Sequence, residues 1–326
     1  MNLNQSSPIL FLGLGGAGQR QLRIMRGLLP RNPFFAFRFT QKTPLLNADF
    51  TVNNKSTLEL EYKLKILNNI NDISKIKPFL TVISLPTSMH AEYSLYAHKI
   101  GSNVFVEKPG FFKNEEISLL KNEFINSELK YMVGFQRQFN PALKALRKIL
   151  RSAKLGKLNK VFVKVSSFIP NWHPYENYKE LYACRSNLGG GILHTECHEL
   201  FLLTTLFGCH KYCNKKFYTS DKHNLDVYDS CELEIGFDDY KIHCDISFMR
   251  EPNERILKFE MEFGTITLDL NSNEILIHKN ENLIEEKTFN ISSDFLFELQ
   301  AKAILELEYD NKVTFRNLEA LGKIIN

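Results

Sequence analysis

The chain has 326 residues, and its 41 lysine and arginine residues against 37 aspartate and glutamate residues give a formal net charge of +4. With 44% hydrophobic and 24% charged residues, it has the composition of a globular protein, which excludes a mainly disordered chain. The length indicates two domains. Neither an apolar stretch of about 18 residues nor a dense basic run is present, so we expect no membrane-spanning segment and no nucleic-acid partner.

The apolar run near the N-terminus has no basic residue before it, since the first is Arg20. A secretory signal needs its positive residues ahead of the apolar core. The six cysteines, all in the second half, are too sparse to imply a disulfide framework in a chain of this length. We therefore expect a cytoplasmic protein with free thiols.

The first 135 residues alternate between short apolar runs and amphipathic segments. The pattern predicts strands at residues 9–14, 34–39, 80–85, 103–106 and 130–134. It predicts helices at residues 19–29, 88–100 and 115–125, and it leaves residues 57–67 undefined. Repeated strand–helix units of this length favour an α/β fold with a doubly wound parallel sheet.

The first predicted strand runs into a glycine loop, GLGGAG, which matches the pattern G-x-G-x-x-G. In a strand–turn–helix unit, Gly13 permits the tight turn, Gly15 lets the backbone approach a pyrophosphate, and Gly18 lets the helix pack against the strand. The first N–H groups of the helix, near Gly16 and Ala17, would face the phosphates. The loop predicts dinucleotide binding; the alternative is a turn with only a structural role.

The end of the second predicted strand bears on which dinucleotide is bound. An NAD site usually has Asp or Glu about 20 residues after the loop, where the acid binds the ribose hydroxyls. Residues 38–42 contain no acid, and Arg38 and Lys42 could attract a 2′-phosphate. NADP is therefore favoured over NAD, unless both cations are ordinary solvated loop residues.

Five segments, in order, resemble the motifs of the Gfo/Idh/MocA oxidoreductases, the group of glucose–fructose oxidoreductase and inositol dehydrogenase. They are the glycine loop and residues 86–90 (PTSMH), 101–109 (GSNVFVEKP), 134–141 (GFQRQFNP) and 189–198 (GGGILHTECH). The resemblance implies a Rossmann domain at residues 1–136 and a substrate-binding domain at residues 137–326, which would also form a homo-oligomer, a dimer or tetramer. It places Pro86 and His90 at the cofactor and implies an NAD(P)-dependent dehydrogenase or reductase of a sugar or nucleotide sugar.

A segment rich in aromatic residues precedes the glycine triplet. Residues 170–178 (PNWHPYENY) resemble a segment of a family branch in bacterial surface-sugar biosynthesis. A sugar ring needs apolar ring faces beside fixed polar groups, which this segment supplies. The alternative is a packed loop whose aromatic residues belong to the core. The candidate substrate contacts are Arg137, Trp172, His173, Tyr178, Arg185 and Thr195.

Lys108 follows a predicted strand at its carboxyl end, where ligands bind in open α/β sheets. Pro109 restrains the Lys108 backbone to an extended conformation and permits a cis bond. An ammonium at this point can hydrogen-bond a substrate oxygen and stabilise charge as a hydride moves. We predict that Lys108 is catalytic and that Glu107 orients it, and the resemblance places both beside the nicotinamide. The alternative is a surface ion pair.

His198 is the second catalytic candidate. The resemblance makes it a general acid/base that also contacts the substrate, with a pKa close to neutrality. The pattern places it inside a helix that begins near Gly191, so the alternative is a buried helix histidine. The chain departs from the family here: Thr195 replaces the usual Asp, and Phe201 replaces the acid of the close branch.

These departures keep a second class of function open, a non-catalytic dinucleotide- or sugar-binding protein. Glu196 and Glu199 are expected to point elsewhere on the helix, so they do not replace the missing acids. A metal site is an alternative for the same helix, since His194 and His198 are four residues apart near several cysteines. No paired C-x-x-C signature accompanies them, and we predict no metal.

Beyond residue 136, several runs alternate polar and apolar residues. They predict strands at residues 160–166, 231–235, 241–248, 256–262, 265–269 and 274–278. Helices are predicted at residues 140–150, 293–307 and 317–325. The alternation favours a second α/β domain with a large, mostly antiparallel open sheet that has one exposed face.

Overall fold

The computed structural model describes residues 3–40, 43–220, 223–292 and 294–326. Its N-terminal part holds six short strands: β1 (Ile9–Leu12), β2 (Phe34–Phe37), β3 (Leu64–Leu67), β4 (Leu80–Ile83), β5 (Asn103–Glu107) and β6 (Tyr131–Gly134). They form one sheet in the order β3-β2-β1-β4-β5-β6, and every neighbouring pair is parallel. This is the strand order of a Rossmann fold, so the predicted doubly wound sheet is confirmed.

Helices link these strands and cover the sheet: α1 (Gly16–Leu28), α2 (Leu58–Tyr62), α3 (Ile73–Ile76), α4 (His90–Lys99) and α5 (Asn114–Phe124). Every residue of β1 and β4 is buried, as continuous apolar runs require at the centre of a parallel sheet. The segment 57–67, undefined in the sequence, forms a five-residue helix followed by the edge strand β3.

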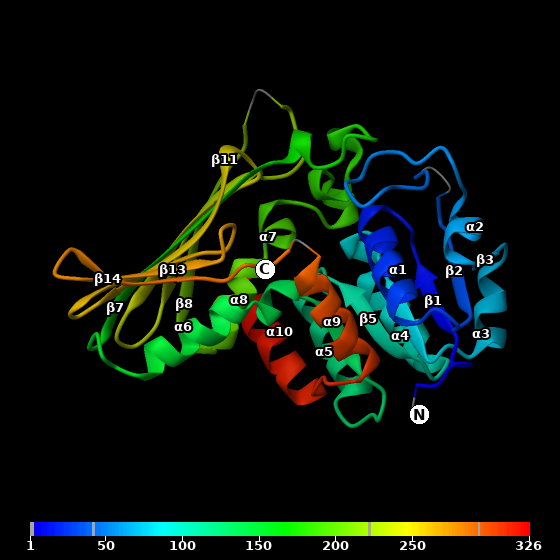
Figure 1. Cartoon of the computed structure of the whole chain (residues 1–326), viewed down its shortest axis with the longest axis horizontal. Coiled ribbons are helices and arrows are strands. Elements are labelled where there is room, and N and C mark those ends of the chain that lie inside the picture. The colour runs from blue at the N-terminus through cyan, green and yellow to red at the C-terminus, as the bar shows by residue number, and fades with distance from the viewer. Residues whose placement is uncertain (1–2, 41–42, 221–222, 293) are drawn as a thin grey trace.

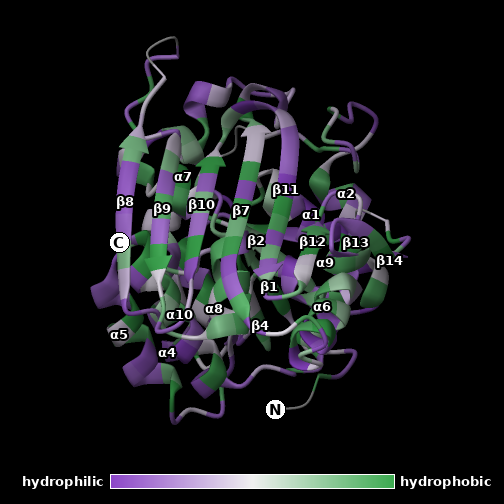
Figure 2. Ribbon diagram, turned by 90° about the vertical axis from the view of Figure 1, so that its left-hand side faces the viewer, coloured by the Kyte–Doolittle hydropathy of each residue, from purple (hydrophilic) through white to green (hydrophobic). Residues whose placement is uncertain are grey.

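The C-terminal part holds the second sheet: β7 (Leu158–Phe168), β8 (Tyr212–Tyr218), β9 (Ser230–Gly236), β10 (Lys241–Ser247), β11 (Met249–Met261), β12 (Gly264–Asp269), β13 (Glu274–Lys279) and β14 (Asn282–Thr288). Their order is β14-β13-β12-β11-β7-β10-β9-β8. Strand β10 runs parallel to β7, and the other neighbouring pairs are antiparallel. Figure 2 shows one face of this sheet uncovered, with the helices behind it, as the alternation predicts.

The two edge strands of this sheet, β8 and β14, escaped the sequence pattern. Almost every residue of β14 is exposed, and β8 has no buried residue. Because neither strand buries one of its faces, neither carries the apolar–polar alternation that identifies a strand.

The remaining helices are α6 (Pro141–Arg151), α7 (Ile192–Thr195), α8 (His198–Phe207), α9 (Phe295–Leu305) and α10 (Asn311–Ile325). Helix α10 begins six residues before the prediction because the Asp310 carboxylate caps it by accepting from the Lys312 amide at 2.8 Å. Helix α9 packs against α1, and α10 packs against α5 and α8. The C-terminal helices therefore pack against the N-terminal domain (Figure 1). The domain boundary near residue 136 stays a prediction.

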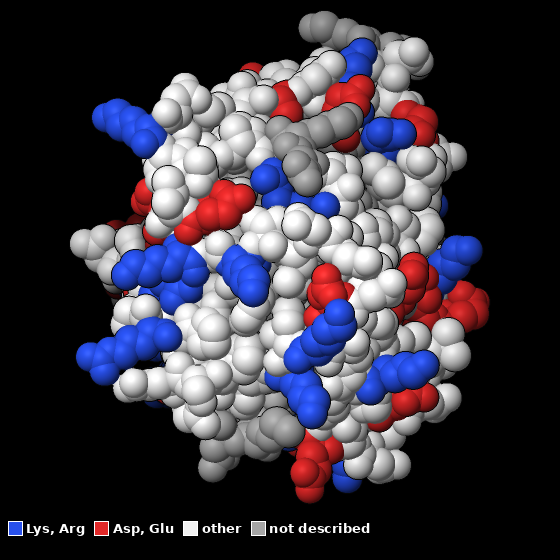
Figure 3. Space-filling model, turned by 90° about the vertical axis from the view of Figure 1, so that its right-hand side faces the viewer, with Lys and Arg blue, Asp and Glu red and all other residues white. Residues whose placement is uncertain are grey.

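Charged side chains of both signs are interspersed over the face of the molecule seen in Figure 3. None of the described helices combines the length and apolar character needed to cross a bilayer.

Candidate functional site

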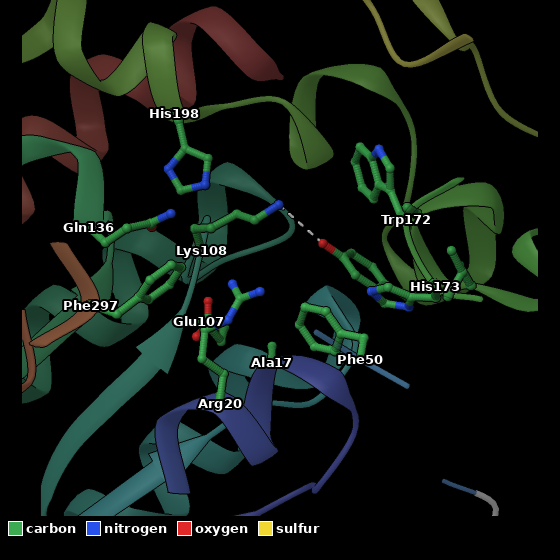
Figure 4. A pocket seen from close by; sticks show the side chains of 13 residues that line it. Ala17, Arg20, Phe50, Glu107, Lys108, Gln136, Trp172, His173, His198 and Phe297 are labelled. Atoms are coloured by element: carbon green, nitrogen blue, oxygen red, sulfur yellow. Dashed lines mark hydrogen bonds between the residues drawn. The ribbon is translucent and has the colours of Figure 1, made fainter. Parts of the chain in front are cut away.

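A cleft of about 380 Å³ lies where α1 and the end of β5 face α8 and the turns before α7 (Figure 4). Its lining comes from both domains: Ala17, Arg20, Phe50, Glu107, Lys108, Gln136, Trp172, His173, Leu181, Tyr182, Ala183, His198 and Phe297. Six of the predicted site residues therefore meet in one cavity: Ala17, Glu107, Lys108, Trp172, His173 and His198. This position, outside the carboxyl ends of parallel strands, is where open α/β sheets bind ligands.

The glycine loop has the geometry that the pattern requires. Gly13 has a φ of +87°, and a β-carbon there would lie 2.5 Å from the Ser84 carbonyl oxygen. A β-carbon on Gly18 would lie 2.4 Å from the Gly13 carbonyl oxygen, so α1 can pack against this turn only through a glycine. A β-carbon on Gly15 would meet nothing within 4 Å. Open space thus lies beside the start of α1, and a pyrophosphate fits that position.

Two aromatic side chains cover the next glycine of the loop. A β-carbon built on Gly16 would lie 2.9 Å from Cε1 of Phe50 and 2.9 Å from the Tyr175 hydroxyl oxygen. The His173 ring lies beside both, with centroids 5.7 Å from Phe50 and 5.3 Å from Tyr175. The segment predicted to contact substrate thus reaches across to the glycine loop of the other domain.

Of the two cations predicted to select NADP, the structure describes only Arg38. Arg38 donates to the Thr43 carbonyl at 2.6 Å, and burial lowers its pKa. Lys42 lies outside the described residues. The preference for NADP over NAD stays a prediction.

The segment 86–90 forms the entry to α4. Pro86 precedes the 3₁₀ turn Thr87–Met89, and His90 begins the helix. The His90 ring is buried, its Nε2 lies 2.9 Å from the Leu85 carbonyl oxygen, and burial lowers its pKa to about 4. A neutral, buried ring is an anchor for this turn, and contact of Pro86 or His90 with a cofactor stays a prediction.

Lys108 points into the cleft from the end of β5, and its peptide bond to Pro109 is cis. Its ammonium donates to the Thr195 carbonyl at 2.6 Å. It also donates to the Tyr182 hydroxyl at 3.2 Å, the bond that is dashed in Figure 4. Burial acts to lower the pKa of Lys108, but its neighbours Tyr182, Cys197 and Glu196 offset this and leave the pKa above its usual value. The ammonium is therefore charged at neutral pH and held by acceptors from the other domain.

Glu107 is held by α1. The Gln21 amide donates to its carboxylate at 3.0 Å. Burial raises the pKa of Glu107, while Gln21, Lys108 and Arg20 oppose that rise. Within the described residues the carboxylate has no hydrogen bond to Lys108, so it acts on the ammonium through charge, and the predicted orienting role is untested.

His198 does not lie inside a continuous helix, which differs from the sequence expectation. Helix α7 ends at Thr195, and His198 is the first residue of α8. The ring is turned into the cleft (Figure 4), where burial and the cations Lys108 and Arg137 lower its pKa well below the usual value. The expected near-neutral pKa is therefore not found, and the imidazole is uncharged at pH 7.

A buried ion cluster lies at the break between α7 and α8. Arg255 of β11 donates to both Glu199 oxygens at 3.0 and 2.9 Å and to Glu196 at 2.6 Å. Glu196 also accepts from the Ser167 hydroxyl at 2.7 Å. All four side chains are buried, and the pairing with Arg255 keeps the pKa of Glu196 below its usual value even though burial alone would raise it. Both glutamates point into the interior behind His198, so neither replaces the missing acids within the cleft.

The two departures from the family pattern have separate consequences. Phe201 stacks on Phe135 with ring centroids 3.8 Å apart, and Phe135 meets His198 edge to face at 5.9 Å. The Thr195 hydroxyl is buried with no hydrogen-bond partner among the described residues, while its carbonyl accepts from Lys108. Among the described residues, no carboxylate forms a hydrogen bond with the His198 ring.

Three other predicted substrate contacts are not among the residues that line the cleft. The Arg137 Nε lies 3.6 Å from Glu199, and the Tyr178 hydroxyl lies 3.0 Å from Nδ1 of His223. The Arg185 carbonyl accepts from two backbone amides of its own turn. Their contact with substrate stays a prediction.

Several cleft residues were not predicted from the sequence. Arg20 follows Ala17 by one helical turn, and this spacing is the signal that could have found it. Tyr182 stands in a 3₁₀ turn, and Phe297 comes from α9, far along the chain. Only the tertiary fold brings the last two to the cleft.

Among the described residues, no group of three or more His, Cys, Asp or Glu side chains could hold a metal ion. The Nε2 of His194 lies 3.0 Å from the Phe112 carbonyl oxygen, and the break after α7 separates it from His198.

No family model matches the chain. It is 30% identical over 98 residues to inositol 2-dehydrogenase of Rhizobium meliloti, an alignment that spans 30% of this chain and only 29% of that enzyme. Two solved structures are similar over nearly the whole chain. The WlbA dehydrogenase of Bordetella pertussis, in complex with NADH and UDP-GlcNAcA, is 15% identical and has a TM-score of 0.74 over 96% of this chain and 93% of that chain. Biliverdin reductase of Synechocystis, with biliverdin and NADP+, is 15% identical and has a TM-score of 0.75 over 97% and 96%.

Both structures share the fold of this chain, a six-stranded parallel sheet joined to a large, mostly antiparallel sheet. The match to inositol 2-dehydrogenase, over less than a third of the chain, agrees with the motif resemblance to the Gfo/Idh/MocA oxidoreductases.

Proposed function

We propose that the chain is an NAD(P)-dependent oxidoreductase that transfers a hydride to or from a carbon of a sugar or nucleotide sugar, in bacterial surface-glycan biosynthesis. One observation carries the proposal. The charged Lys108 ammonium lies at the carboxyl end of β5, bonded to Tyr182 and the Thr195 carbonyl, in the cleft that also exposes the His198 ring.

The glycine loop fits the cofactor. The open space beside Gly15 and the first N–H groups of α1 would hold the pyrophosphate. When bound, a nicotinamide dinucleotide supplies the carbon that accepts or donates the hydride. We favour NADP because residues 38–42, directly after β2, contain no acid, and a titration that shows tighter NAD binding would reverse this choice.

Lys108 would hydrogen-bond the reacting substrate oxygen. The Thr195 carbonyl and the Tyr182 hydroxyl fix the ammonium before substrate arrives, so little reorganisation is needed as negative charge develops on that oxygen. His198, uncharged because its pKa is lowered, would take the hydroxyl proton during oxidation and return it during reduction.

The cleft wall suits a sugar ring. Trp172 and Tyr182 supply apolar ring faces, and Lys108, Gln136 and His173 supply polar groups. The bound UDP-GlcNAcA of the WlbA structure supports a nucleotide sugar, and the inositol 2-dehydrogenase match supports a polyol ring. The uncovered face of the eight-stranded sheet is our proposed contact between copies in a homo-oligomer, which light scattering would test.

The test is a substrate panel. The purified chain is mixed with NAD+ or NADP+ and, in turn, UDP-N-acetylglucosamine, its uronic acid, UDP-glucose and myo-inositol, and the near-ultraviolet absorbance of reduced nicotinamide is followed. We expect turnover with at least one of them that Lys108→Met abolishes and the exposed control Lys113→Met keeps. Equal rates in Lys108→Met and the wild type would contradict the proposal.

A second candidate is a binding protein without catalysis. It is favoured by Thr195 and Phe201, which replace the two acids of the family pattern, so that no described carboxylate is hydrogen-bonded to His198. Tight dinucleotide binding together with no turnover of any sugar in the panel would support it, and a stereospecific hydride transfer would eliminate it.

A further inference from the structure

Arg20 occupies an unusual position in the cleft. It lies on α1 three residues after Ala17, and its side chain points from the helix into the cavity (Figure 4). The guanidinium carbon is 4.7 Å from the Phe50 ring centroid and 4.5 Å from the Phe297 centroid. Two rings from separate parts of the chain therefore hold the planar cation by cation–π contacts.

The polar edge of this guanidinium is not bonded to any residue that the structure describes. Within the described residues, Arg20 has neither a hydrogen bond nor an ion pair within 4 Å. Its neighbours on α1 differ, because Arg23 pairs with Asp294 at 3.2 Å and Arg26 donates to the Tyr62 carbonyl at 2.9 Å. Burial lowers the pKa of Arg20, and the charge of Glu107 opposes that change. A partly desolvated guanidinium with five N–H donors and no acceptor is suited to an anionic ligand.

The helix geometry shows where that ligand would lie. Side chains on an α-helix lean toward its N-terminus, and residues three apart share a face. Arg20 therefore leans back toward Ala17. Cε1 of Phe50, the ring that its guanidinium contacts, also lies 2.9 Å from a β-carbon built on Gly16, next to the open space beside Gly15. The glycine loop offers backbone N–H groups to a phosphate in this space but carries no charged side chain.

We propose that Arg20 binds a phosphate oxyanion of a bound nucleotide and supplies the charge that the glycine loop lacks. The inference rests on the proposed function and names the ligand class of that site. The planar donor edge of arginine matches two phosphate oxygens, and the rings of Phe50 and Phe297 fix the plane of the guanidinium. The pyrophosphate of the dinucleotide fits the position, and the diphosphate of a nucleotide sugar carries the same chemistry.

The test measures binding, so it needs no turnover. NADH, ADP-ribose and UDP are titrated by calorimetry into the wild type, Arg20→Gln, Arg20→Lys and the matched control Arg23→Gln. We expect Arg20→Gln to weaken NADH and ADP-ribose by about 10- to 100-fold, because a charge-assisted hydrogen bond is lost. Arg20→Lys should recover part of the affinity, since it keeps the charge but not the planar pair of donors. Arg23→Gln should bind both ligands as the wild type does.

The outcomes separate the two phosphate sources. A loss confined to UDP would assign the same anion site to the nucleotide of the substrate. If the wild type binds these ligands and Arg20→Gln binds all of them equally well, the inference is wrong while the proposed function stands. Equal losses in Arg20→Gln and Arg23→Gln would show a general charge effect and also overturn it. A wild type that binds none of the three would contradict the proposed function itself. Thermal unfolding of each variant checks that the folds are alike.

Discussion

The two walls of the cleft are built differently. On the N-terminal wall, Ala17 and Lys108 stand at the start of a helix and the end of a strand, so the regular elements of the parallel sheet place them. On the C-terminal wall, Tyr182 lies in a 3₁₀ turn and His198 follows a helix break. That break is held from behind by Arg255 on β11. The regular elements thus place Ala17 and Lys108, whereas long-range contacts of Arg255 accompany the position of His198.

Removing the cation of that cluster tests this contrast most severely. Arg255→Met leaves Glu196 and Glu199 buried without their partner, so we expect the free energy of unfolding to fall by about 3–5 kcal/mol. The control Arg250→Met breaks a half-exposed pair with Asp245 and should cost at most about 1 kcal/mol. Chemical denaturation compares them, and equal losses would mean that the C-terminal wall does not depend on the cluster.

Lys108 joins the two walls, since it leaves β5 and bonds to the opposite side. Lys108→Met should lower turnover of an identified substrate by about 10²- to 10³-fold, the usual cost of losing one preorganised donor. The free energy of unfolding should change little by comparison with Arg255→Met. Steady-state kinetics and denaturation of the same preparation provide both numbers, and a loss of stability that matches the loss of rate would contradict a catalytic role.

In the N-terminal domain, protonation of His90 should lower the free energy of unfolding as pH falls. Its folded pKa of about 4 lies below the unfolded value of 6.5, so the unfolded chain binds the extra proton first as pH falls. The contribution of His90 to stability is thus complete above pH 6.5 and is lost as pH falls toward 4, by roughly 3 kcal/mol. His198 acts in the same direction, whereas the raised pKa of Glu107 opposes it.

His90→Gln keeps a donor toward the Leu85 carbonyl but cannot titrate. Its free energy of unfolding, measured across this pH window, should therefore fall less steeply than that of the wild type. Equal slopes for the two proteins would show that His90 is protonated as easily in the folded chain as in the unfolded one.

Substitutions at two glycines of the loop test folding and cofactor binding separately. Gly18→Ala places a methyl group 2.4 Å from the Gly13 carbonyl oxygen and should destabilise the fold by about 1–3 kcal/mol. Gly15→Ala meets open space, so it should fold normally and weaken NADH binding. Thermal unfolding and calorimetric titration distinguish them, and normal NADH binding by Gly15→Ala would contradict the predicted position of the pyrophosphate.

Removal of the Tyr182 hydroxyl should have the smallest effect on turnover. Tyr182→Phe keeps the ring but loses one hydrogen bond to Lys108, which still has the Thr195 carbonyl, so turnover should fall only about fivefold. The same change at Tyr240, which packs against Phe207 outside the cleft, should have no effect on turnover. A loss as large as that of Lys108→Met would show that Tyr182 takes a direct part in proton transfer.

The sequence predicts the N-terminal wall of the cleft better than the C-terminal wall. The apolar strands, the glycine loop and Lys108 were placed correctly because neighbouring residues determine a buried strand, a tight turn and the residue that ends a strand. The position of His198 was missed because the helix pattern continues through residues 192–207. The ion pair between Arg255 and Glu196, which lies at the break, joins residues 59 positions apart, so no local pattern indicates it.

The outer strands and the aromatic contacts were missed for related reasons. Strand β14 buries nothing, so it leaves no alternation to detect. Phe50 and Phe297 meet Arg20 across more than 240 positions of sequence, and no local pattern connects them. Glu196 is an acid that follows a short helix, and only its contacts with Ser167 and Arg255 show that it is buried.

Isotope transfer tests the central claim most directly, because it detects hydride movement in either direction. The chain is incubated with each sugar of the panel, a trace of oxidised dinucleotide and, in separate reactions, reduced dinucleotide deuterated at one or the other face of the nicotinamide C4. We predict that one sugar acquires a single deuterium at one carbon, from one face only, and that Lys108→Met removes this transfer. A chain that binds both dinucleotide and sugar but places no deuterium in any sugar would contradict the account.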